Sequence, residues 1–370
     1  MLSMRPRSCA AKIPENGTFV HRKLHHSLRR TREAGTQTRP CRAATHQEES
    51  MDNPNPNALR RSLLIAGSTL ALAPRLAFAQ AKYPSRPVDF IVPWGAGGGA
   101  DQLARRLGSL IEKDLGVSLP ILNIAGATGN TGMTKLLSAP ADGHSMAVFI
   151  ADTLGTLAGG AGRYKLSDLA PLGIMIRQPS GLFVKADAKW KTFDELLAEA
   201  KTREIKVGIT GFGGPDEMHV VKFNEQGAKF RPVPFAKPGE RYSSVLGGHA
   251  DVVIEQAGDV RSFLDSKQMR PILFYAEQPQ VGYEDIALAK KYGVTLAISQ
   301  FRAIVMRAGT DPKQLAVMAA AMDKAAHSPE FRKYLADELA FADSYIPAAK
   351  AGPFMAEQLA LIDANMPKKS

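Results

Sequence analysis

The sequence predicts an α/β protein built on largely parallel β-sheet, because short apolar runs alternate with helix-like segments from Arg86 onward. Glycine-rich turns join several of these runs to the segment that follows, most clearly at residues 95–99 and 126–132. Parallel strands need a crossover connection, usually through a helix, and these connections are right-handed almost without exception. The chain has 370 residues, 45% of them hydrophobic, so it is long enough for two domains. This balance excludes collagen, coiled coil, bulk disorder and a polytopic membrane protein.

The first part of the pattern contains three strands and two helices. Strands are predicted at residues 86–92, 119–124 and 145–150. Asp101 is predicted to cap the first helix, whose apolar residues recur at helical spacing: Leu103, Leu107, Leu110 and Ile111. A second helix follows the glycines at 126–132 and carries Met133, Leu136 and Leu137.

The pattern resumes after Pro179 with shorter strands. They are predicted at residues 181–184, 205–210, 233–235, 252–254 and 271–274. Thr192 and Glu195 form a capping box at the start of a helix. Asp311 and Ser328 each precede a proline, which is the signature of a helix N-terminus.

The charge is concentrated at the N-terminus. The formal net charge is +11, but most of the excess lies in the first 79 residues, and the rest of the chain is nearly neutral. The remaining chain therefore lacks the charge signature of a nucleic-acid-binding protein. Both cysteines, Cys9 and Cys41, also lie in this region, which excludes disulfides, thiolate metal sites and cysteine nucleophiles from the remainder.

Residues 51–79 are predicted to be a secretory signal peptide. A basic segment precedes the uncharged apolar stretch 62–73, which is too short to span about 30 Å of hydrocarbon, and Ala77-Phe78-Ala79 forms a cleavage site. We expect cleavage after Ala79 and a periplasmic protein. The alternative is a buried N-terminal helix in a cytoplasmic protein. Arg60-Arg61 faintly resembles a twin-arginine export signal, and the sequence does not choose between the export routes.

Residues 1–50 are interpreted as a non-native extension. A signal peptide that begins after fifty other residues is poorly placed for export, so Met51 is the expected start of the natural chain. The alternative is a genuine basic extension that binds another molecule.

The glycine turns are candidate anion sites. Glycines allow a ligand to approach the backbone closely, and the free N–H groups at the start of the following helix attract negative charge. Turns of this kind occur at residues 94–101, 126–132 and 211–216. Ligands of open α/β sheets bind at the carboxyl ends of strands, where these turns lie. Each turn could also be simply a tight connection between a strand and a helix.

The first turn also matches the dinucleotide-binding fingerprint. This match is weak, because Asn123 stands where an acidic residue would be expected to bind the ribose. The chain after residue 79 has no histidine spacing typical of zinc sites and no nucleophile elbow. We therefore expect no cofactor, no metal and no enzymatic activity. An exported nucleotide-dependent oxidoreductase is retained as an alternative.

A series of short motifs follows the signal peptide in a fixed order. They are Tyr83-Pro84-Ser85-Arg86-Pro87, Pro93-Trp94-Gly95-Ala96-Gly97-Gly98-Gly99-Ala100-Asp101, and the segments 126–132, 139–144, 233–235 and 246–251. Each motif is modest alone, but their order behind a signal peptide is specific. With these motifs, the chain from Tyr83 to the C-terminus resembles the Bug-type extracytoplasmic solute receptors, the binding proteins of tripartite tricarboxylate transporters.

The resemblance implies a two-lobed periplasmic binding protein of type II, a Venus flytrap with parallel or mixed sheets and two crossover strands. The crossings are expected near residues 182–185 and 301–306. Lobe 1 would comprise residues 82–183 plus 304–370, and lobe 2 residues 184–303. The resemblance also implies a monomer that binds a small carboxylate, passes it to membrane transporter subunits and binds no nucleic acid. A ligand-sensing receptor for a signalling system is an alternative.

The candidate ligand-binding residues come from the glycine turns and from the loops of lobe 2. They are Trp94, Gly95, Gly97, Gly98, Gly99, Gly126, Thr128, Gly129, Asn130, Asp152, Gly213, Gly214, Asp216, His219, Phe235 and Lys237. A ligand carboxylate is expected against the N–H groups of residues 97–99 and 126–130. His219 is assigned either to the cleft or to packing. Trp94 is expected to form a wall of the pocket.

The acids of lobe 2 depart from the family pattern. Asp216 and Glu217 are expected to point away from a simple dicarboxylate, or to pair with a cation such as Lys237 or Arg241, because unpaired like charges in a closing cleft are costly. If the ligand instead carries an amine or a hydroxyl, Asp216 is its expected partner.

Overall fold

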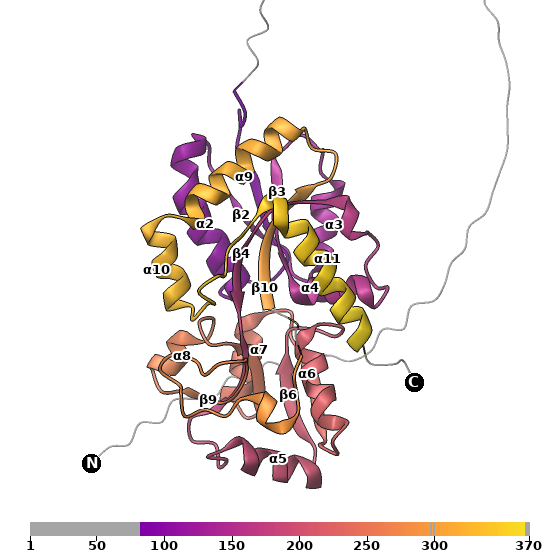
Figure 1. The fold of residues 1–370 in the computed structure, drawn as a ribbon, viewed down its shortest axis with the longest axis vertical. Coiled ribbons are helices and arrows are strands. Elements are labelled where there is room, and N and C mark those ends of the chain that lie inside the picture. The colour runs from indigo at the N-terminus through magenta and orange to yellow at the C-terminus, as the bar shows by residue number, and fades with distance from the viewer. Residues whose placement is uncertain (1–81, 297, 299, 367–370) are drawn as a thin grey trace, which may run out of the picture. The chain divides into compact units, whose positions relative to one another are not determined.

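Two mixed β-sheets, each with its own helices, make up the computed structural model, which describes residues 82–296, 298 and 300–366 (Figure 1). The described residues all fall within one compact unit of the chain. The predicted signal peptide, its cleavage site at Ala79 and residues 1–50 lie outside them.

The first sheet has the strand order β11-β4-β10-β3-β1-β2. Its strands are β1 (Asp89–Val92), β2 (Ile121–Asn123), β3 (Ser145–Ile150), β4 (Leu169–Gln178), β10 (Gln300–Arg307) and β11 (Ile346–Pro347). Strand β1 pairs in parallel with both β2 and β3, as the glycine turns and helices between them require. Strand β10 is antiparallel to β3 and β4, so the sheet is mixed.

The second sheet has the strand order β7-β6-β8-β5-β9. Its strands are β5 (Ser180–Lys185), β6 (Ile205–Ile209), β7 (Phe230–Pro234), β8 (Val252–Gln256) and β9 (Met269–Tyr275). Strand β6 is parallel to β7 and β8, whereas β5 is antiparallel to β8 and β9. Every strand predicted after Pro179 therefore overlaps a strand of this sheet. Phe235, the last residue of the predicted strand 233–235, lies just beyond the end of β7.

The helices are divided between the two sheets (Figure 1). Those with the first sheet are α2 (Gly99–Leu115), α3 (Asn130–Ser138), α4 (Ala151–Ala158), α9 (Pro312–Ala326), α10 (Pro329–Asp337) and α11 (Ala348–Asn365). Those with the second are α5 (Phe193–Thr202), α6 (Pro215–Asn224), α7 (Pro238–Leu246) and α8 (Arg261–Asp265). Short 3₁₀ turns are η2 (Ala127–Gly129), η3 (Leu166–Asp168) and η4 (Ala289–Tyr292). No helix within the described ranges is long and apolar enough to cross a membrane.

The structure confirms three of the four predicted helix caps and contradicts the fourth. The side chains of Thr192, Asp311 and Ser328 each accept a backbone N–H at the start of a helix, which confirms three predicted caps. The prediction for Asp101 is wrong. Helix α2 begins inside the glycine turn with Gly98 as its N-cap, because glycine leaves the turn free to enter the helix early.

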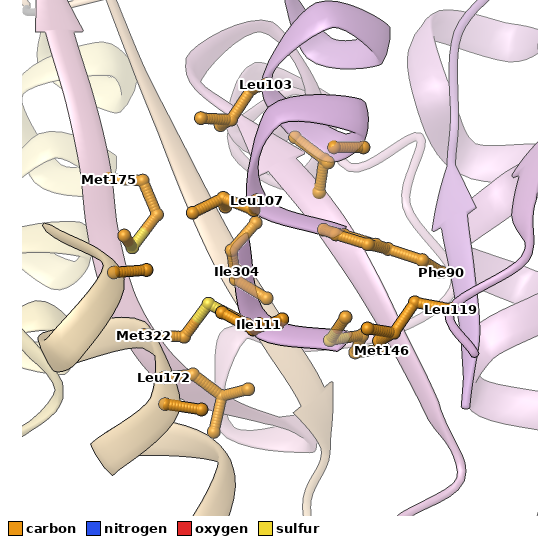
Figure 2. Close-up of a cluster of buried hydrophobic side chains, with 14 of the residues drawn as sticks. Phe90, Leu103, Leu107, Ile111, Leu119, Met146, Leu172, Met175, Ile304 and Met322 are labelled. Carbon is orange, nitrogen blue, oxygen red and sulfur yellow. The ribbon is translucent and has the colours of Figure 1, made fainter. Parts of the chain in front are cut away.

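Helix α2 shows why the apolar spacing predicted the fold correctly. Leu103, Leu107 and Ile111 lie on one face and are fully buried. They pack against the first sheet, where Phe90 of β1 and Ile304 of β10 face them (Figure 2). Burial of each such side chain contributes about 1.5–3 kcal/mol to folding. This packing fixes the start of α2, and the glycine turn before it, against the end of β1.

The chain passes between the sheets at two points. Strand β4 ends in the first sheet at Gln178 and β5 begins in the second at Ser180, so Pro179 marks the first passage. The chain returns to the first sheet by Gln300, where β10 begins. The first passage comes slightly before the crossing expected at residues 182–185. The lobe boundaries 82–183 plus 304–370 and 184–303 stay a prediction. The name lobe 1 is used for the first sheet with its helices, and lobe 2 for the second sheet with its helices.

Candidate functional site

A network around Asp101 holds the first glycine turn in place. The Asp101 carboxylate accepts the N–H of Gly97 at 3.0 Å and the side-chain amide of Asn123 at 3.0 Å. Arg105 donates to the same carboxylate at 2.9 Å. Burial opposes ionisation of Asp101, but these hydrogen bonds outweigh it and lower its pKa. Asn123, which weakened the nucleotide-binding interpretation, also donates to the Trp94 carbonyl and so supports the turn.

A cavity lies where this turn meets the loops of lobe 2. Its volume is about 40 Å³, enough for a few water molecules. The residues around it come from both lobes and are Trp94, Gly98, Gly99, Ala100, Ile150, Asp152, Gln178, Thr210, Pro238, Arg241, Glu255, Gln256, Asp259, Gln300, Phe301 and Arg302. The two lobes are closed on one another here, so a larger ligand enters only when the cleft opens.

One buried ion pair in the cavity wall joins the two lobes. Arg302 of β10 pairs with Asp259, which follows β8, and both side chains are buried. The same guanidinium donates to Gln178 of lobe 1 and to Gln256 of lobe 2, the latter at 3.1 Å. Arg302 therefore contacts both lobes at once, and opening the cleft would break part of this network.

A second buried ion pair lies wholly within lobe 2. Arg241 of α7 pairs with Glu255 of β8, whose carboxylate also accepts the Tyr242 hydroxyl at 2.9 Å. Arg241 further donates to the Phe235 carbonyl at 3.0 Å. Burial alone would raise the pKa of Glu255, but the charge and hydrogen bonds of Arg241 lower it. Opening the cleft leaves this pair intact.

Two further carboxylates face each other across the cleft. Asp152 at the start of α4 and Asp216 at the start of α6 both accept the side-chain amide of Gln300, each at 3.1 Å. Burial, with the charge of Asp216, raises the pKa of Asp152 well above its usual range. Burial, with the charge of Glu255, also raises the pKa of Asp216. The closed cleft therefore favours the protonated forms of these two acids.

Glycines allow this close approach at the starts of two helices. A Cβ atom at Gly99, in the first turn of α2, would overlap the Asp259 carboxylate of lobe 2. A Cβ atom at Gly214, the N-cap of α6, would overlap the Asp152 carboxylate of lobe 1. Each lobe thus places an aspartate against the glycine-lined helix start of the other, where the helix dipole favours negative charge.

Four of the predicted ligand-binding residues line the cavity. They are Trp94, Gly98, Gly99 and Asp152. The indole of Trp94 is almost wholly buried, and its N–H has no partner among the described residues. Gly98 packs so tightly on Pro238 that a Cβ atom would overlap the proline ring.

Other predicted residues bring the lobes together without lining the cavity. Gly95 donates its N–H to the Ala236 carbonyl at 3.5 Å. Thr128 packs against Gly211 in the third glycine turn, and Gly213 packs against Gly155 of α4. Gly214, in the same turn, lies against Asp152. The glycines of the third turn thus serve the contact between the lobes.

The remaining residues of the first two turns make contacts within lobe 1. The N–H of Gly97 is taken by Asp101, so it is not free for a ligand. Gly126 accepts the N–H of Gly129 at 3.0 Å. The side-chain oxygen of Asn130 accepts the Thr156 hydroxyl at 3.2 Å. None of these candidates lines the described cavity.

The expected cation partners of Asp216 are wrong. Lys237 is exposed and pairs with Glu240 at 2.9 Å, and Arg241 pairs with Glu255. Asp216 is held instead by the N–H of Thr210 at 3.0 Å and by Gln300. Backbone and amide donors replace the cation, because Asp216 lies beside the end of β6.

The other lobe 2 candidates lie outside the cavity wall. His219 is stacked on Tyr275 with ring centroids 3.8 Å apart, and burial lowers its pKa to about 3, so it is neutral. It borders a second hollow, which shares Gln178 and Gln300 with the cavity wall. Phe235 contributes its carbonyl to Arg241. The carboxylate of Glu217 accepts the N–H of Gly213 at 2.6 Å, away from the cavity.

The sequence reasoning missed several residues that form the wall. It did not single out Gln178, Asp259, Gln300 or Arg302, and it placed Gln256 in the cleft only as part of the loop 255–258. The available signal was polarity inside apolar strands: β10 reads QFRAIVMR, and β8 ends in Glu255-Gln256. Charged and amide side chains in otherwise buried strands are costly unless they are paired or serve a site. Within the described residues, no group of three or more His, Cys, Asp or Glu side chains is placed to hold a metal ion.

Comparisons with known proteins agree on one family. The model of the tripartite tricarboxylate transporter family receptor matches residues 103–363, which span both sheets. Protein BugT of Bordetella pertussis is 26% identical over 271 residues, covering 70% of this chain and 82% of BugT.

Two solved structures extend this similarity to the fold. A TctC solute binding protein from Polaromonas, without ligand, is 27% identical with a TM-score of 0.56, over 76% of this chain and 98% of that one. MatC from Rhodopseudomonas palustris, with bound malate, is 20% identical with a TM-score of 0.69, over 76% and 99% of the two chains. The two-lobed fold of this chain is thus similar to the folds of these two proteins.

Proposed function

The chain belongs to the tripartite tricarboxylate transporter receptor family, and from that premise we propose that it captures a small organic acid in the cleft between its lobes. The motif resemblance in the sequence is thereby confirmed at the level of the family. The fold is that of a two-lobed periplasmic binding protein. The observation that carries the ligand proposal is the cavity between the lobes, which combines buried hydrogen-bond donors with the start of helix α2.

Fewer backbone N–H groups are proposed to bind the ligand carboxylate than the sequence suggested. The start of α2 at Gly98 and Gly99 borders the cavity, and a helix N-terminus favours an anion. The N–H of Gly97 is left out, because Asp101 accepts it. The malate bound to MatC supports a ligand of this class, since malate is itself a small carboxylate.

The proposal extends to the cell-level role. The receptor would be exported to the periplasm, act as a monomer and pass its ligand to the membrane subunits of the transporter, without catalysing a reaction. N-terminal sequencing of periplasmic material tests the export step, with Gln80 as the expected first residue. Retention in the cytoplasm would contradict it.

A thermal-shift screen tests the ligand class. We expect at least one acid among succinate, malate, adipate, citrate, aromatic acids and amino acids to raise the melting temperature, because a ligand of the closed form stabilises it. NAD and NADP are included as controls for the oxidoreductase alternative. A screen in which only a dinucleotide gives a shift would overturn the proposed function.

A further inference from the structure

Some charged side chains in the cavity wall have a counterion, and one does not. Both arginines are already paired, Arg241 with Glu255 and Arg302 with Asp259. Asp152 also lines the cavity and is about 1% exposed, but it makes no ion pair with any described residue. When Asp152 is ionised, the uncompensated charge of this wall is negative, and burial together with the charge of Asp216 raises the pKa of Asp152. A plain dicarboxylate would find the charges of both guanidinium groups already paired.

Asp152 differs from Asp216, its neighbour across the cleft. Both carboxylate oxygens of Asp216 accept hydrogen bonds, from Thr210 and from Gln300. Only Oδ2 of Asp152 accepts one, from the same Gln300 amide. Its Oδ1 lies against Gly214 of lobe 2 and has no hydrogen-bond partner among the described residues, although it is buried. Asp152, and not Asp216, therefore has hydrogen-bonding capacity left for a ligand.

The same wall also contains donors without partners. The indole N–H of Trp94 and the Nε–H of Arg241 are buried and unpaired within the described chain. Both side chains line the cavity and are about 3% exposed. A buried donor or acceptor without a hydrogen bond costs about 1–3 kcal/mol of stability. Such atoms therefore mark the places where a ligand would be held. The wall thus offers two free donors and an acid without a cation. Oδ1 of Asp259 is buried and unpaired as well, but this acid already has Arg302 as its counterion.

We propose that the ligand is an acid that also carries a protonated amine, with the ammonium group on Asp152 and a carboxylate directed at Trp94, Arg241 and the start of helix α2. This inference rests on the proposed function and narrows its ligand class. An ammonium group supplies both the charge and the hydrogen bond that Asp152 lacks. The carboxylate accepts from the free donors, and the paired arginines keep their partners.

Matched ligand pairs that differ only in the amine test this proposal. The pairs are L-aspartate with succinate, L-glutamate with glutarate, and L-alanine with propionate, titrated calorimetrically into the mature protein at pH 7. We expect the amino member of at least one pair to bind at least tenfold more tightly. A des-amino member that binds as tightly as its amino partner in every pair, or more tightly, overturns the inference.

The Asp152→Asn variant locates the preference. It removes the charge and keeps the shape, so the amino member should lose at least tenfold in affinity while the des-amino member changes less than threefold. Asp187→Asn is the control, because Asp187 is an exposed acid paired with Lys185 at 3.0 Å. A preference that survives Asp152→Asn overturns the assignment to Asp152.

The outcomes separate the two levels of the proposal. If succinate or glutarate binds and the amino members do not, the receptor function stands and the amine inference fails. If no acid in the panel, malate and adipate included, binds or raises the melting temperature, the proposed function fails and the inference fails with it. The wild-type titrations decide the amine preference even if Asp152→Asn does not fold.

Discussion

The two buried arginine–carboxylate pairs of the cleft have the same chemistry, but one lies within a single lobe and the other joins the two lobes. Arg241 and Glu255 both belong to lobe 2, so their contact exists whether the cleft is open or closed. Arg302 belongs to lobe 1 and Asp259 to lobe 2, so their contact forms only on closure. The first pair is part of the folded lobe, and the second is part of the closed state.

This difference decides which free energy each pair affects. Removing one partner of a buried pair leaves an uncompensated charge in a low-dielectric site. Within lobe 2 that charge stays among residues of one folded lobe when the cleft opens, so the loss appears chiefly in the free energy of unfolding. Across the cleft, opening returns the charge to water, so the loss appears in the equilibrium between open and closed forms.

The largest effect is expected for Glu255→Ala. It leaves Arg241 buried without its counterion and should lower the free energy of unfolding by about 3–5 kcal/mol. Urea unfolding followed by circular dichroism measures the change. The double variant Arg241→Met/Glu255→Leu should recover most of the loss, since an apolar pair of similar volume carries no charge. A double variant as unstable as the single one would contradict the explanation.

A smaller loss of stability is expected for Arg302→Met. Opening lets Asp259 reach water, so the free energy of unfolding should fall by about 1–3 kcal/mol. The ligand-free protein should also show a larger radius of gyration by small-angle X-ray scattering. Lys324→Met, which removes an exposed ion pair with Asp114, is the control. A loss equal to that of Glu255→Ala with an unchanged radius would show that the cleft does not open.

The Gly98→Val variant tests whether the ligand approaches the backbone at the start of α2. The added side chain would overlap Pro238 in the closed form and crowd the start of α2. Affinity for a ligand found in the screen should fall at least tenfold, about 1.4 kcal/mol, with little change in the fold. Gly239→Ala is the matched control, because a Cβ at that position would meet no atom within 4 Å apart from its own neighbours in α7. Unchanged affinity in Gly98→Val would reject the proposed carboxylate position.

The smallest effect is expected from pH. In the closed form Asp152 and Asp216 have raised pKa values, with Arg241 and Glu255 as charged neighbours. The closed state then binds more protons than the unfolded chain, where an aspartate has a pKa of about 3.9. Their contribution to stability is fully present below that value and is lost as pH rises through the raised pKa values.

Melting temperatures measured from pH 4 to pH 8 test this dependence. The wild type should lose stability relative to the double variant Asp152→Asn/Asp216→Asn as the pH rises, because an asparagine does not ionise. The same difference at every pH would show that these two acids do not titrate with folding or closure.

The sequence by itself determined many of the strands and helices and the family, although β4, α4 and α11 were not among the predicted elements. The spacing of Leu103, Leu107 and Ile111 predicts a helix with one buried face, because helical periodicity and burial are properties of neighbouring residues. The caps at Thr192, Asp311 and Ser328 were equally local. The glycine turns were located correctly for the same reason, although the start of α2 inside its turn was not.

Only the tertiary structure decided which polar groups share the cleft. Arg302 and Asp259 are far apart in the chain, and no local pattern says that β10 delivers one beside the other. From the sequence, Lys237 and Arg241 were expected as partners of Asp216, but in the folded protein both cations pair with other acids. It also used the glycines for contact between the lobes as well as for the cavity. Periodicity is set by local backbone geometry, whereas charge pairing depends on distances through space that the folded lobes alone define.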